Sequence, residues 1–466
     1  MSTNELSNKI RGTLFVLLAV FTMASTGWTA TYYVNGSTGS DGYNGLYESY
    51  QGGSNGPWKT IQYAANTAPP GSHLITVAAG TYPERITVSK SGTDANNPLR
   101  FFANGNANTQ GFILNGNYIQ IEGLTATSVT CAWGEGAGVR VFGSGCVVKN
   151  CIVQDCLREG IRIERYADRC IVTDNTIRRC GIDGINVTAG STNALIENND
   201  ISDSRSVVSG CTYEEANGIY FHGSGHTFRG NYIHDIVFAN QSGYQPHIDA
   251  FQTFYDNGDS ATNCTFERNH IYLMEEALSG VVTVCGFMLA GASNITIKNN
   301  LIESWSGINT GGGGNSNLKI YNNTFRSSLS YKSAYWPVGI DLENVTNAEV
   351  YNNITCDFSY AHYKISGGSG ISRDYNCIFN SDGSTPKIEG GSAAAHDLWK
   401  KDALFVVKFT DLHLQSNSPC MDAGTPVLQV TNDFDGKPRP QGSGFDIGAY
   451  ELDTTRPAPP ANLRIL

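Results

Sequence analysis

The sequence has few charged residues for its length, and basic residues are the scarcer kind. Asp, Glu, Lys and Arg together make up 16% of 466 residues, and the formal net charge is −11. A surplus of negative charge disfavours binding to the phosphates of nucleic acids or to anionic membranes. These two classes are therefore excluded as the main partner. An acidic polymer can bind only through a local basic patch or a divalent cation.

A hydrophobic run long enough to span a membrane is also lacking at the N-terminus. The apolar run Leu14–Phe21 is too short for a stable transmembrane helix. It follows Lys9 and Arg11 and precedes small residues up to Ala30, which is the order found in a secretory signal peptide. We therefore predict that residues 1–30 are removed and that the mature protein is secreted, extracellular and without a transmembrane segment.

Glycine is abundant, with 52 residues, and a short phrase built on asparagine recurs through the chain. In each phrase an asparagine is followed two residues later by a β-branched or aromatic residue, and the phrases are 23 to 38 residues apart. A period of this size indicates stacked supersecondary units. The asparagines are Asn150, Asn175, Asn199, Asn231, Asn269, Asn300, Asn323, Asn353 and Asn376.

A second phrase, a glycine followed by alternating apolar residues, precedes most of these asparagines. The alternation in both phrases predicts two short strands per repeat, hence an all-β solenoid. Such strands stack on the rungs above and below, and their inward residues form one continuous core. The asparagines are expected at the same bend of every rung, as a structural ladder. The glycines are Gly138, Gly160, Gly184, Gly218, Gly286, Gly307 and Gly339.

Both ends of such a solenoid need a cover, because an open edge promotes aggregation. The segment Trp58–Asn66 has helical spacing and is predicted to be a short helix over the first rung. After the signal peptide, the chain divides into a β-helix at residues 31–400, a C-terminal capping module at 401–452 placed over the last rung, and a proline-rich tail at 453–466.

The segments Tyr32–Asn35, Trp58–Asn66 and Leu74–Tyr82 resemble the leading segment of the pectate-lyase-like right-handed parallel β-helix superfamily, as it occurs in family 9 polysaccharide lyases. The resemblance covers roughly residues 31–380. It implies a right-handed parallel β-helix, and this handedness also agrees with the general preference of parallel crossovers.

Two further resemblances concern the C-terminus. Asn417–Gly424 and Asp433–Pro440 look like the closing module that follows such β-helices in bacterial surface and secreted proteins. Residues 461–466 resemble the first strand of a fibronectin type III domain, which suggests a cell-surface or fibronectin-type-III-linked context.

All 12 cysteines lie beyond residue 130, an even number that suits an oxidising compartment. Cys146 and Cys170 precede their asparagines by similar distances, and Cys156 and Cys180 follow theirs. Neighbouring rungs are about 4.8 Å apart, within the Cα separation that a disulfide tolerates. We predict the disulfides Cys146–Cys170 and Cys156–Cys180. The alternative is a stack of buried free thiols.

The longest turns, 201–218, 233–247, 271–286 and 325–339, all precede a strand of the second kind. Loops differ between rungs whereas the scaffold repeats, so these turns are expected to form one wall of a groove. The strand after 233–247 begins with the only His-x-Asp-x-x-Gln of the chain, in which His247 replaces the glycine.

Outward positions beside these turns carry the candidate site residues. The catalytic candidates are His247, Asp249, Tyr220 and His222. The candidates for substrate binding are Arg162, Arg140, Asn186, Tyr244, the aromatic loop residues Tyr335 and Trp336, and Gln252 if its strand is bulged.

Two reactions on polysaccharides fit these residues. In β-elimination from a uronic acid polymer, Tyr220 with His222 or His247 would act as acid and base, while Arg162 and Arg140, or a calcium ion, would neutralise the uronate. In glycoside hydrolysis, two carboxylates about 5 to 9.5 Å apart are needed. The partner of Asp249 would then be one of four loop residues, Asp203, Glu214, Glu215 or Asp235.

A metal is a further expectation. Asp249 and Asp235 are candidate calcium ligands, because calcium prefers carboxylate oxygens. Zinc held by nearby histidines is an alternative, although no His-x-x-x-His pair is present.

The motifs that carry the reaction in the resembling families are absent. The polygalacturonase motifs Asn-Thr-Asp and Gly-His-Gly, the aspartate cluster of family 9 lyases and the Arg-His-Gly of family 6 lyases do not occur. The leading hypothesis is a secreted protein that binds an acidic polysaccharide and cleaves it by β-elimination. The alternatives are a non-catalytic adhesive or structural β-helix and a glycoside hydrolase that uses Asp249.

Overall fold

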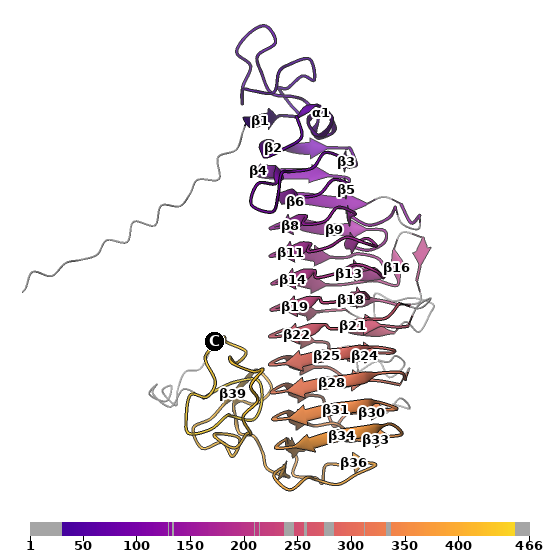
Figure 1. The fold of residues 1–466 in the computed structure, drawn as a ribbon, viewed down its shortest axis with the longest axis vertical. Helices are drawn as coiled ribbons and strands as arrows, with labels where there is room; N and C mark the ends of the chain where they lie inside the picture. The colour runs from indigo at the N-terminus through magenta and orange to yellow at the C-terminus, as the bar shows by residue number, and fades with distance from the viewer. Residues whose placement is uncertain are drawn as a thin grey trace, which may run out of the picture.

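The computed structural model describes residues 30–128, 130–132, 135–208, 210–213, 215–236, 247–255, 259–274, 284–311, 313–331 and 337–452. These residues form a parallel β-helix whose rungs stack from β1 to β36 (Figure 1). The predicted all-β parallel solenoid is therefore confirmed. Within the described part of the chain, no helix has the length and apolarity needed to cross a membrane.

The N-terminal rungs contain long strands and a short helix. The helix α1 (Ile61–Thr67) confirms the predicted cover, and its Ile61, Ala64 and Ala65 are buried. The side chain of Thr60 accepts the N–H of Tyr63 and thereby caps the helix. After the five-residue strand β1 (Ala30–Val34), the long strands are β2 (His73–Tyr82), β4 (Leu99–Thr109) and β6 (Ile119–Ser128).

From β7 onward a complete rung has three strands rather than the two predicted, so the strands form three columns. The strand missed from the sequence comes just before each asparagine. It is often only three residues long with one buried side chain, too short to show a period. This first column contains β8 (Val147–Lys149), β11 (Ile171–Thr173), β14 (Leu195–Glu197), β19 (Thr227–Arg229), β22 (Thr265–Glu267), β25 (Ser293–Lys298), β28 (Ser316–Tyr321), β31 (Thr346–Tyr351) and β34 (Ser369–Asp374).

The second column follows the asparagine bend. Its strands are β9 (Ile152–Cys156), β12 (Thr176–Arg178), β15 (Asp200–Ser202), β20 (Tyr232–His234), β23 (His270–Tyr272), β26 (Leu301–Glu303), β29 (Thr324–Arg326), β32 (Ile354–Cys356), β35 (Cys377–Phe379) and β37 (Leu398–Trp399).

The third column is a separate sheet of 12 strands, and it carries the candidate site. Its strands are β3 (Ile86–Val88), β5 (Phe112–Leu114), β7 (Val139–Val141), β10 (Ile161–Ile163), β13 (Asp183–Val187), β18 (Asn217–Phe221), β21 (Ile248–Thr253), β24 (Val284–Leu289), β27 (Ser306–Asn309), β30 (Val338–Glu343), β33 (Ala361–Ser366) and β36 (Ile388–Glu389).

Like residues stack along the axis because neighbouring rungs pair in parallel and in register. In the core, Phe228 lies over Phe266 with ring centroids 4.6 Å apart, and Phe251 lies over Phe287 at 5.0 Å. These rings and the aliphatic side chains of the other rungs form one continuous cluster. A single apolar core along the whole coil follows from this register.

Eight buried asparagines form the predicted ladder between the first and second columns. At each step, Nδ2 donates to Oδ1 of the next asparagine over 2.9 to 3.1 Å. The same Oδ1 also accepts a main-chain N–H, as in Asn199 to Asn231, and Nδ2 also donates to a main-chain carbonyl. The members are Asn175, Asn199, Asn231, Asn269, Asn300, Asn323, Asn353 and Asn376.

Asn150 does not belong to the ladder. The equivalent position is Cys151, whose N–H donates to Oδ1 of Asn175. Asn150 itself is exposed one residue earlier, with a left-handed φ of 51°. At the other end, Asp397 accepts the N–H of Asn376 and closes the ladder.

The predicted disulfides Cys146–Cys170 and Cys156–Cys180 are wrong, because all four cysteines are buried free thiols. The members of each pair stack in register on adjacent rungs, so their side chains run parallel. Rungs are about 4.8 Å apart, whereas a disulfide needs Cβ atoms about 3.8 Å apart and facing each other. Burial raises the pKa of Cys146 to about 12 and that of Cys170 to about 11, so both remain protonated.

A different disulfide, Cys131–Cys211, links two loops 80 residues apart in the sequence. Cys131 follows β6, and Cys211 lies in a small hairpin of β16 (Val207–Val208) and β17 (Cys211–Thr212). The hairpin stands at the edge of the third column (Figure 1). This cross-link ties together loops on the edge where the sequence predicts a groove wall.

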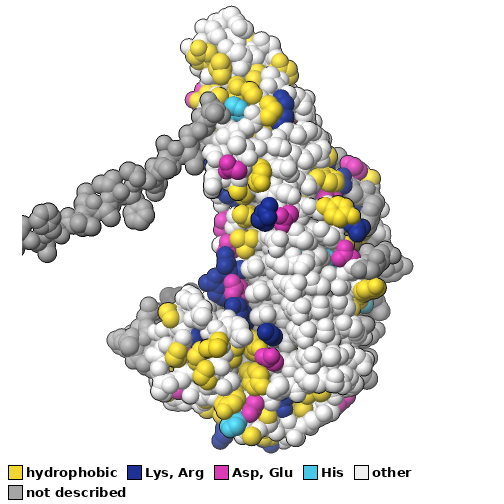
Figure 2. Space-filling view, in the orientation of Figure 1, with side chains coloured by type: hydrophobic (Ala, Val, Ile, Leu, Met, Phe, Trp, Pro, Cys, Tyr) yellow, Lys and Arg dark blue, Asp and Glu magenta, His cyan; other side chains and the backbone are white. Residues whose placement is uncertain are grey.

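The C-terminal module lies against the flank of the β-helix, so its predicted position over the last rung is corrected (Figure 1). It contains the hairpin of β38 (Phe405–Val407) and β39 (Asp411–Leu414). Its Phe405 and Ile447 share a second apolar core with Leu301 of β26 and Phe379 of β35. Figure 2 shows the module projecting from the side of the coil.

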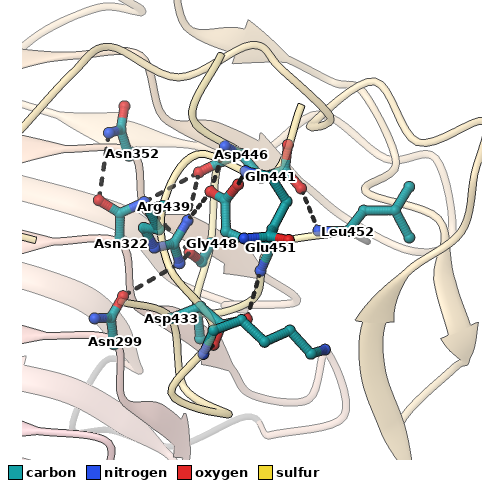
Figure 3. Close-up of polar contacts among 12 residues, drawn as sticks. Asn299, Asn322, Asn352, Asp433, Arg439, Gln441, Asp446, Gly448, Glu451 and Leu452 are labelled. Atoms are coloured by element: carbon teal, nitrogen blue, oxygen red, sulfur yellow. Dashed lines mark hydrogen bonds and ion pairs between the residues drawn. The ribbon is translucent and has the colours of Figure 1, made fainter. Parts of the chain in front are cut away.

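A buried arginine anchors this module (Figure 3). Arg439 pairs with Glu451, and its Nη2 donates to Oδ1 of Asn299 over 3.2 Å and to the carbonyl of Gly448 over 2.7 Å. Asn322 and Asn352 of the next two rungs also bond main-chain groups of the module. These three asparagines each precede a ladder asparagine, so Asn-Asn pairs mark the docking surface.

We expect Asn231→Ala to lower the free energy of unfolding by about 3 kcal/mol or more, because it orphans several buried groups. These include the N–H of Asn199 and the carbonyl of Ile196. Urea unfolding followed by circular dichroism measures the change. The matched control is Asn108→Ala at an exposed strand position. Equal midpoints for the two variants would show that the ladder does not stabilise the coil.

Candidate carboxyl site on the third sheet

Five predicted site residues stack in one row on the outer face of the third column. Parallel pairing places Arg140 beside Arg162, Asn186 beside Tyr220, and Tyr220 beside Gln252. We call this the Tyr220 row, and it continues downward through Met288, Asn309, Asp341 and Lys364. Arg140, Arg162, Asn186 and Tyr220 therefore lie on the face that the sequence predicts, and Gln252 joins them.

The register of β21 differs from the prediction. His247 pairs with Glu215, and Phe251 pairs with Ile219. Ala250, not His247, therefore takes the place of the glycine, and it is fully buried. Phe251 points into the core rather than outward. Gln252 reaches the outer face without the bulge on which the prediction depends.

A second outward row consists of the residues just before the glycines. A Cβ on Gly184 would lie 2.4 Å from the core side chain of Ile201, so this position faces inward and the preceding Asp183 faces outward. We call this the Asp183 row. Its members are Glu159, Asp183, Asn217, Asp249 and Cys285.

The arginines at the top of the face are held in ion pairs. Nη1 of Arg162 lies 2.8 Å from Glu159, and its Nε lies 3.1 Å from Glu164. Arg140 contacts Glu164 at 2.8 Å and Glu135 at 3.1 Å. Their positive charges are therefore neutralised within the protein. The predicted role of these arginines in neutralising a uronate is not supported by this arrangement.

Below the arginines, amide side chains link the carboxyl groups of three rungs. Nδ2 of Asn217 lies 3.0 Å from Asp183 and 3.2 Å from Glu215. Gln252 donates to Glu215 over 3.1 Å, and Asn186 donates to Asp183 over 2.7 Å. Among the described residues, the side chains that donate to Asp183 and Glu215 are therefore neutral amides.

Two buried carboxyl groups of this face, those of Asp183 and Asp249, have raised pKa values. Burial, reinforced by the charge of Glu159, raises the pKa of Asp183 to about 8. Burial and the charge of Glu215 raise the pKa of Asp249 well above its ordinary value. Both carboxyl oxygens of Asp249 and Oδ1 of Asn217 are buried, and among the described residues none of the three has a hydrogen-bond partner. A proton on Asp249 would provide the missing donor.

Three further catalytic candidates lie close to this network. Tyr220 is half-buried, and its ring packs edge-on against His222 with centroids 4.9 Å apart. His222 is buried, and its Nε2 lies 2.8 Å from the carbonyl of Phe254, which requires a proton on that nitrogen. His247 is exposed at the start of β21, in register with Glu215. His247 and the half-buried Glu215 are therefore the members nearest to solvent.

The predicted calcium ligands do not meet at one place. Asp235 is exposed after β20, where its Oδ2 lies 2.6 Å from His234, while Asp249 is buried in the third column. Asp203 pairs with Arg205. In the described part of the chain, no three His, Cys, Asp or Glu side chains form a group that could hold a metal. Tyr244, Tyr335, Trp336 and Glu214 lie outside the described residues.

Sequence reasoning missed Asp183 and Asn217, and it included Glu215 only as one of several partners for Asp249. A signal for the first two was present. Glu159, Asp183 and Asn217 each directly precede a glycine of the second phrase, and strand alternation places that position on the outer face. The register of β21 comes from the pairing of Glu215 with His247 and of Tyr220 with Gln252.

Comparisons with known proteins agree with this fold. Residues 85–214 match the family model described as right handed beta helix region. The complex structure of XylC with xylose superposes with a TM-score of 0.50 at 11% identity, covering 90% of this chain and 98% of that chain. Among curated protein sequences, none matches significantly. These matches confirm the right-handed parallel coil.

Two other solved structures are similar at lower scores. The pectate lyase Pel9A has a TM-score of 0.47 and 16% identity, covering 91% of this chain and 98% of that chain. PfbA, a surface adhesin of Streptococcus pneumoniae, has a TM-score of 0.43 and 14% identity, covering 65% and 86%.

The raised pKa of Asp183 predicts a dependence of stability on pH. The folded protein keeps this proton up to about pH 8, whereas an unfolded aspartate loses it near pH 4. The stability gained from the group is complete below about pH 4 and is lost as pH rises to 8, with a slope of about 1.4 kcal/mol per pH unit. We expect Asp183→Asn to remove this slope in urea unfolding between pH 5 and 8.

The control for this measurement is Asp174→Asn, an exposed aspartate at a left-handed bend that asparagine also accepts. It should retain the pH dependence of the parent protein. An Asp183→Asn variant with an unchanged slope would mean that Asp183 is ionised in the folded protein.

Proposed function

We propose that this chain, a β-helix with the fold of the pectate-lyase-like superfamily, binds a polysaccharide on the outer face of its third column and cleaves glycosidic bonds there. The observation that carries the proposal is the clustering of Asp183, Glu215 and Asp249 from three consecutive rungs. Export, as the N-terminal segment predicts, would bring the protein to extracellular polysaccharides.

The cluster has the electrostatic property that acid–base cleavage needs. Carboxyl groups placed close together in a buried site cannot all ionise, so some keep their protons at neutral pH. Asp183 and Asp249 are the members whose pKa values are raised, and Glu215 is the member nearest to solvent. An accessible carboxylate beside carboxyl groups that hold protons can accept a proton from water.

The residues divide into two roles. Glu215 meets the substrate and accepts a proton from the water that bonds to the anomeric carbon. His247, in register beside it, donates a proton to the glycosidic oxygen as the bond from that oxygen to the anomeric carbon breaks. Asp249 and Asp183 are positioning residues, because they are buried and act through the orientation of Glu215.

Hydrolysis fits this face better than the β-elimination predicted from the sequence. Elimination requires a cation that neutralises the uronate, and Arg140 and Arg162 are already paired with glutamates. The elimination route and the acidic substrate remain predictions. A non-catalytic adhesive protein would use the same face without the acid–base step, so the buried carboxyl cluster favours an enzyme.

The test incubates the mature protein with neutral, amino-sugar and uronic acid polysaccharides and measures new reducing ends together with the absorbance of unsaturated products. We expect reducing ends without unsaturated product on at least one polymer. Glu215→Gln should lower kcat about 100-fold or more, because it removes the base that accepts the proton of water. Asp249→Asn should shift the pH profile of kcat, an effect that a purely structural role would not produce.

The matched control, Asp174→Asn, lies on an exposed bend of another column and should leave activity unchanged. Formation of an unsaturated product would show that the protein cleaves by elimination and not by hydrolysis. Binding of a polymer with no new ends on any substrate would leave the adhesive function. Full activity of the Glu215→Gln variant would show that Glu215 is not a catalytic residue.

A further inference from the structure

A pocket of about 220 Å³ opens on the same outer face, lower on the coil. It lies over β27, β30 and β33, and its polar lining consists of Asn309, Asp341, Glu343 and Lys364, with Ser306 at its edge. Asn309, Asp341 and Lys364 continue the Tyr220 row. The volume accommodates one sugar ring.

One polar atom in this pocket lacks a partner. The side chain of Asp341 is nine-tenths buried, and its Oδ2 lies 3.1 Å from Nζ of Lys364. Its Oδ1 is buried, and among the described residues no donor reaches it. A buried carboxylate oxygen without a donor is unfavourable, so a ligand that donates a hydrogen bond would be stabilised there.

The backbone of the pocket is fixed before any ligand binds. The buried hydroxyl of Thr310 accepts the N–H of Glu343 over 2.9 Å and lies 3.0 Å from the carbonyl oxygen of Asp341. Lys364 lies 2.6 Å from Glu343 as well as next to Asp341, and so holds both carboxylates in place. A site with fixed polar groups loses less entropy on binding.

The charges of the pocket limit the ligand. Two carboxylates, Asp341 and Glu343, face one ammonium group, that of Lys364. The pocket therefore has one more acidic than basic side chain in its lining. A uronate would add a third carboxylate, whereas a sugar hydroxyl or amino group supplies the missing donor.

We infer that this pocket binds a non-anionic sugar residue of the polysaccharide, through a hydroxyl or amino donor to Asp341, as a subsite remote from the carboxyl cluster. This inference rests on the proposed function for its polymeric ligand. Three steps along the Tyr220 row separate Gln252 from Asp341, which is about 14 Å at about 4.8 Å per rung. Only an oligosaccharide that spans this length contacts both places.

The binding test uses the full protein with Glu215→Gln, which allows binding to be measured without cleavage. Cellohexaose, a glucosamine hexamer and hexagalacturonate are the neutral, cationic and anionic probes in isothermal titration calorimetry. We expect the neutral or the cationic hexamer to bind, and Asp341→Ala to weaken that binding about tenfold, as the loss of a charge-assisted hydrogen bond predicts. Affinity for hexagalacturonate should not depend on Asp341.

Asp341→Asn serves as a second variant, because it preserves the volume if Asp341→Ala fails to fold. The control is Asp382→Asn, an exposed aspartate in a loop outside the pocket. The inference is overturned if no hexamer binds, if neither Asp341 variant changes any affinity, or if the hexagalacturonate affinity is the one that falls.

A kinetic measurement separates this inference from the proposed function. In the otherwise unchanged protein, Asp341→Ala should raise KM for a cleavable hexasaccharide with kcat retained, and it should not affect a disaccharide that cannot span three rungs. Asp341-dependent binding without any cleavage would support the subsite and refute the enzyme. Cleavage that is unaffected by Asp341 at every chain length would refute the subsite alone.

Discussion

The amide ladder from Asn175 to Asn376 is the constraint on which the remaining structure depends. Each amide satisfies a main-chain N–H, a main-chain carbonyl and the next amide, so no rung can slide without orphaning several buried groups. A slip of one residue would also turn core side chains outward. The ladder therefore holds the parallel register, and the register determines which side chains meet on the surface.

A fixed parallel register has a chemical consequence on the outer face, because side chains of adjacent rungs lie about 4.8 Å apart. Where the chain places carboxyl groups on consecutive rungs, they must be paired with cations or keep protons. Near Arg162 the chain uses ion pairs with Glu159 and Glu164. Around Asp183 and Asp249 it uses amides instead, and the pKa values rise. The parallel stacking of the rungs thus brings together the carboxyl groups whose pKa values are raised.

The fold could be read from the sequence because its signal repeats, and the site could not because its signal occurs once. The ladder asparagines, the core glycines and the helix at Trp58–Asn66 each follow from local rules that the structure obeys. The shift at Asn150 and the register of β21 depend instead on pairing between rungs, which a single chain does not reveal. The sequence therefore predicts that His247 takes the place of a glycine, whereas in the structure Ala250 takes that place.

The placement of the C-terminal module has a bearing on where a polymer can bind. Arg439 and the Asn-Asn pairs fix the module on the bends between the first and second columns, where it covers part of the flank. The third column is on another side of the coil, so its outer face stays clear of the module from the arginines to the pocket at Asp341 (Figure 1). Along this face the polar groups change from ion-paired arginines to carboxyl groups with raised pKa values, and then to the pocket at Asp341. The two directions along the axis are therefore different. An extended chain bound along it would consequently have one preferred orientation.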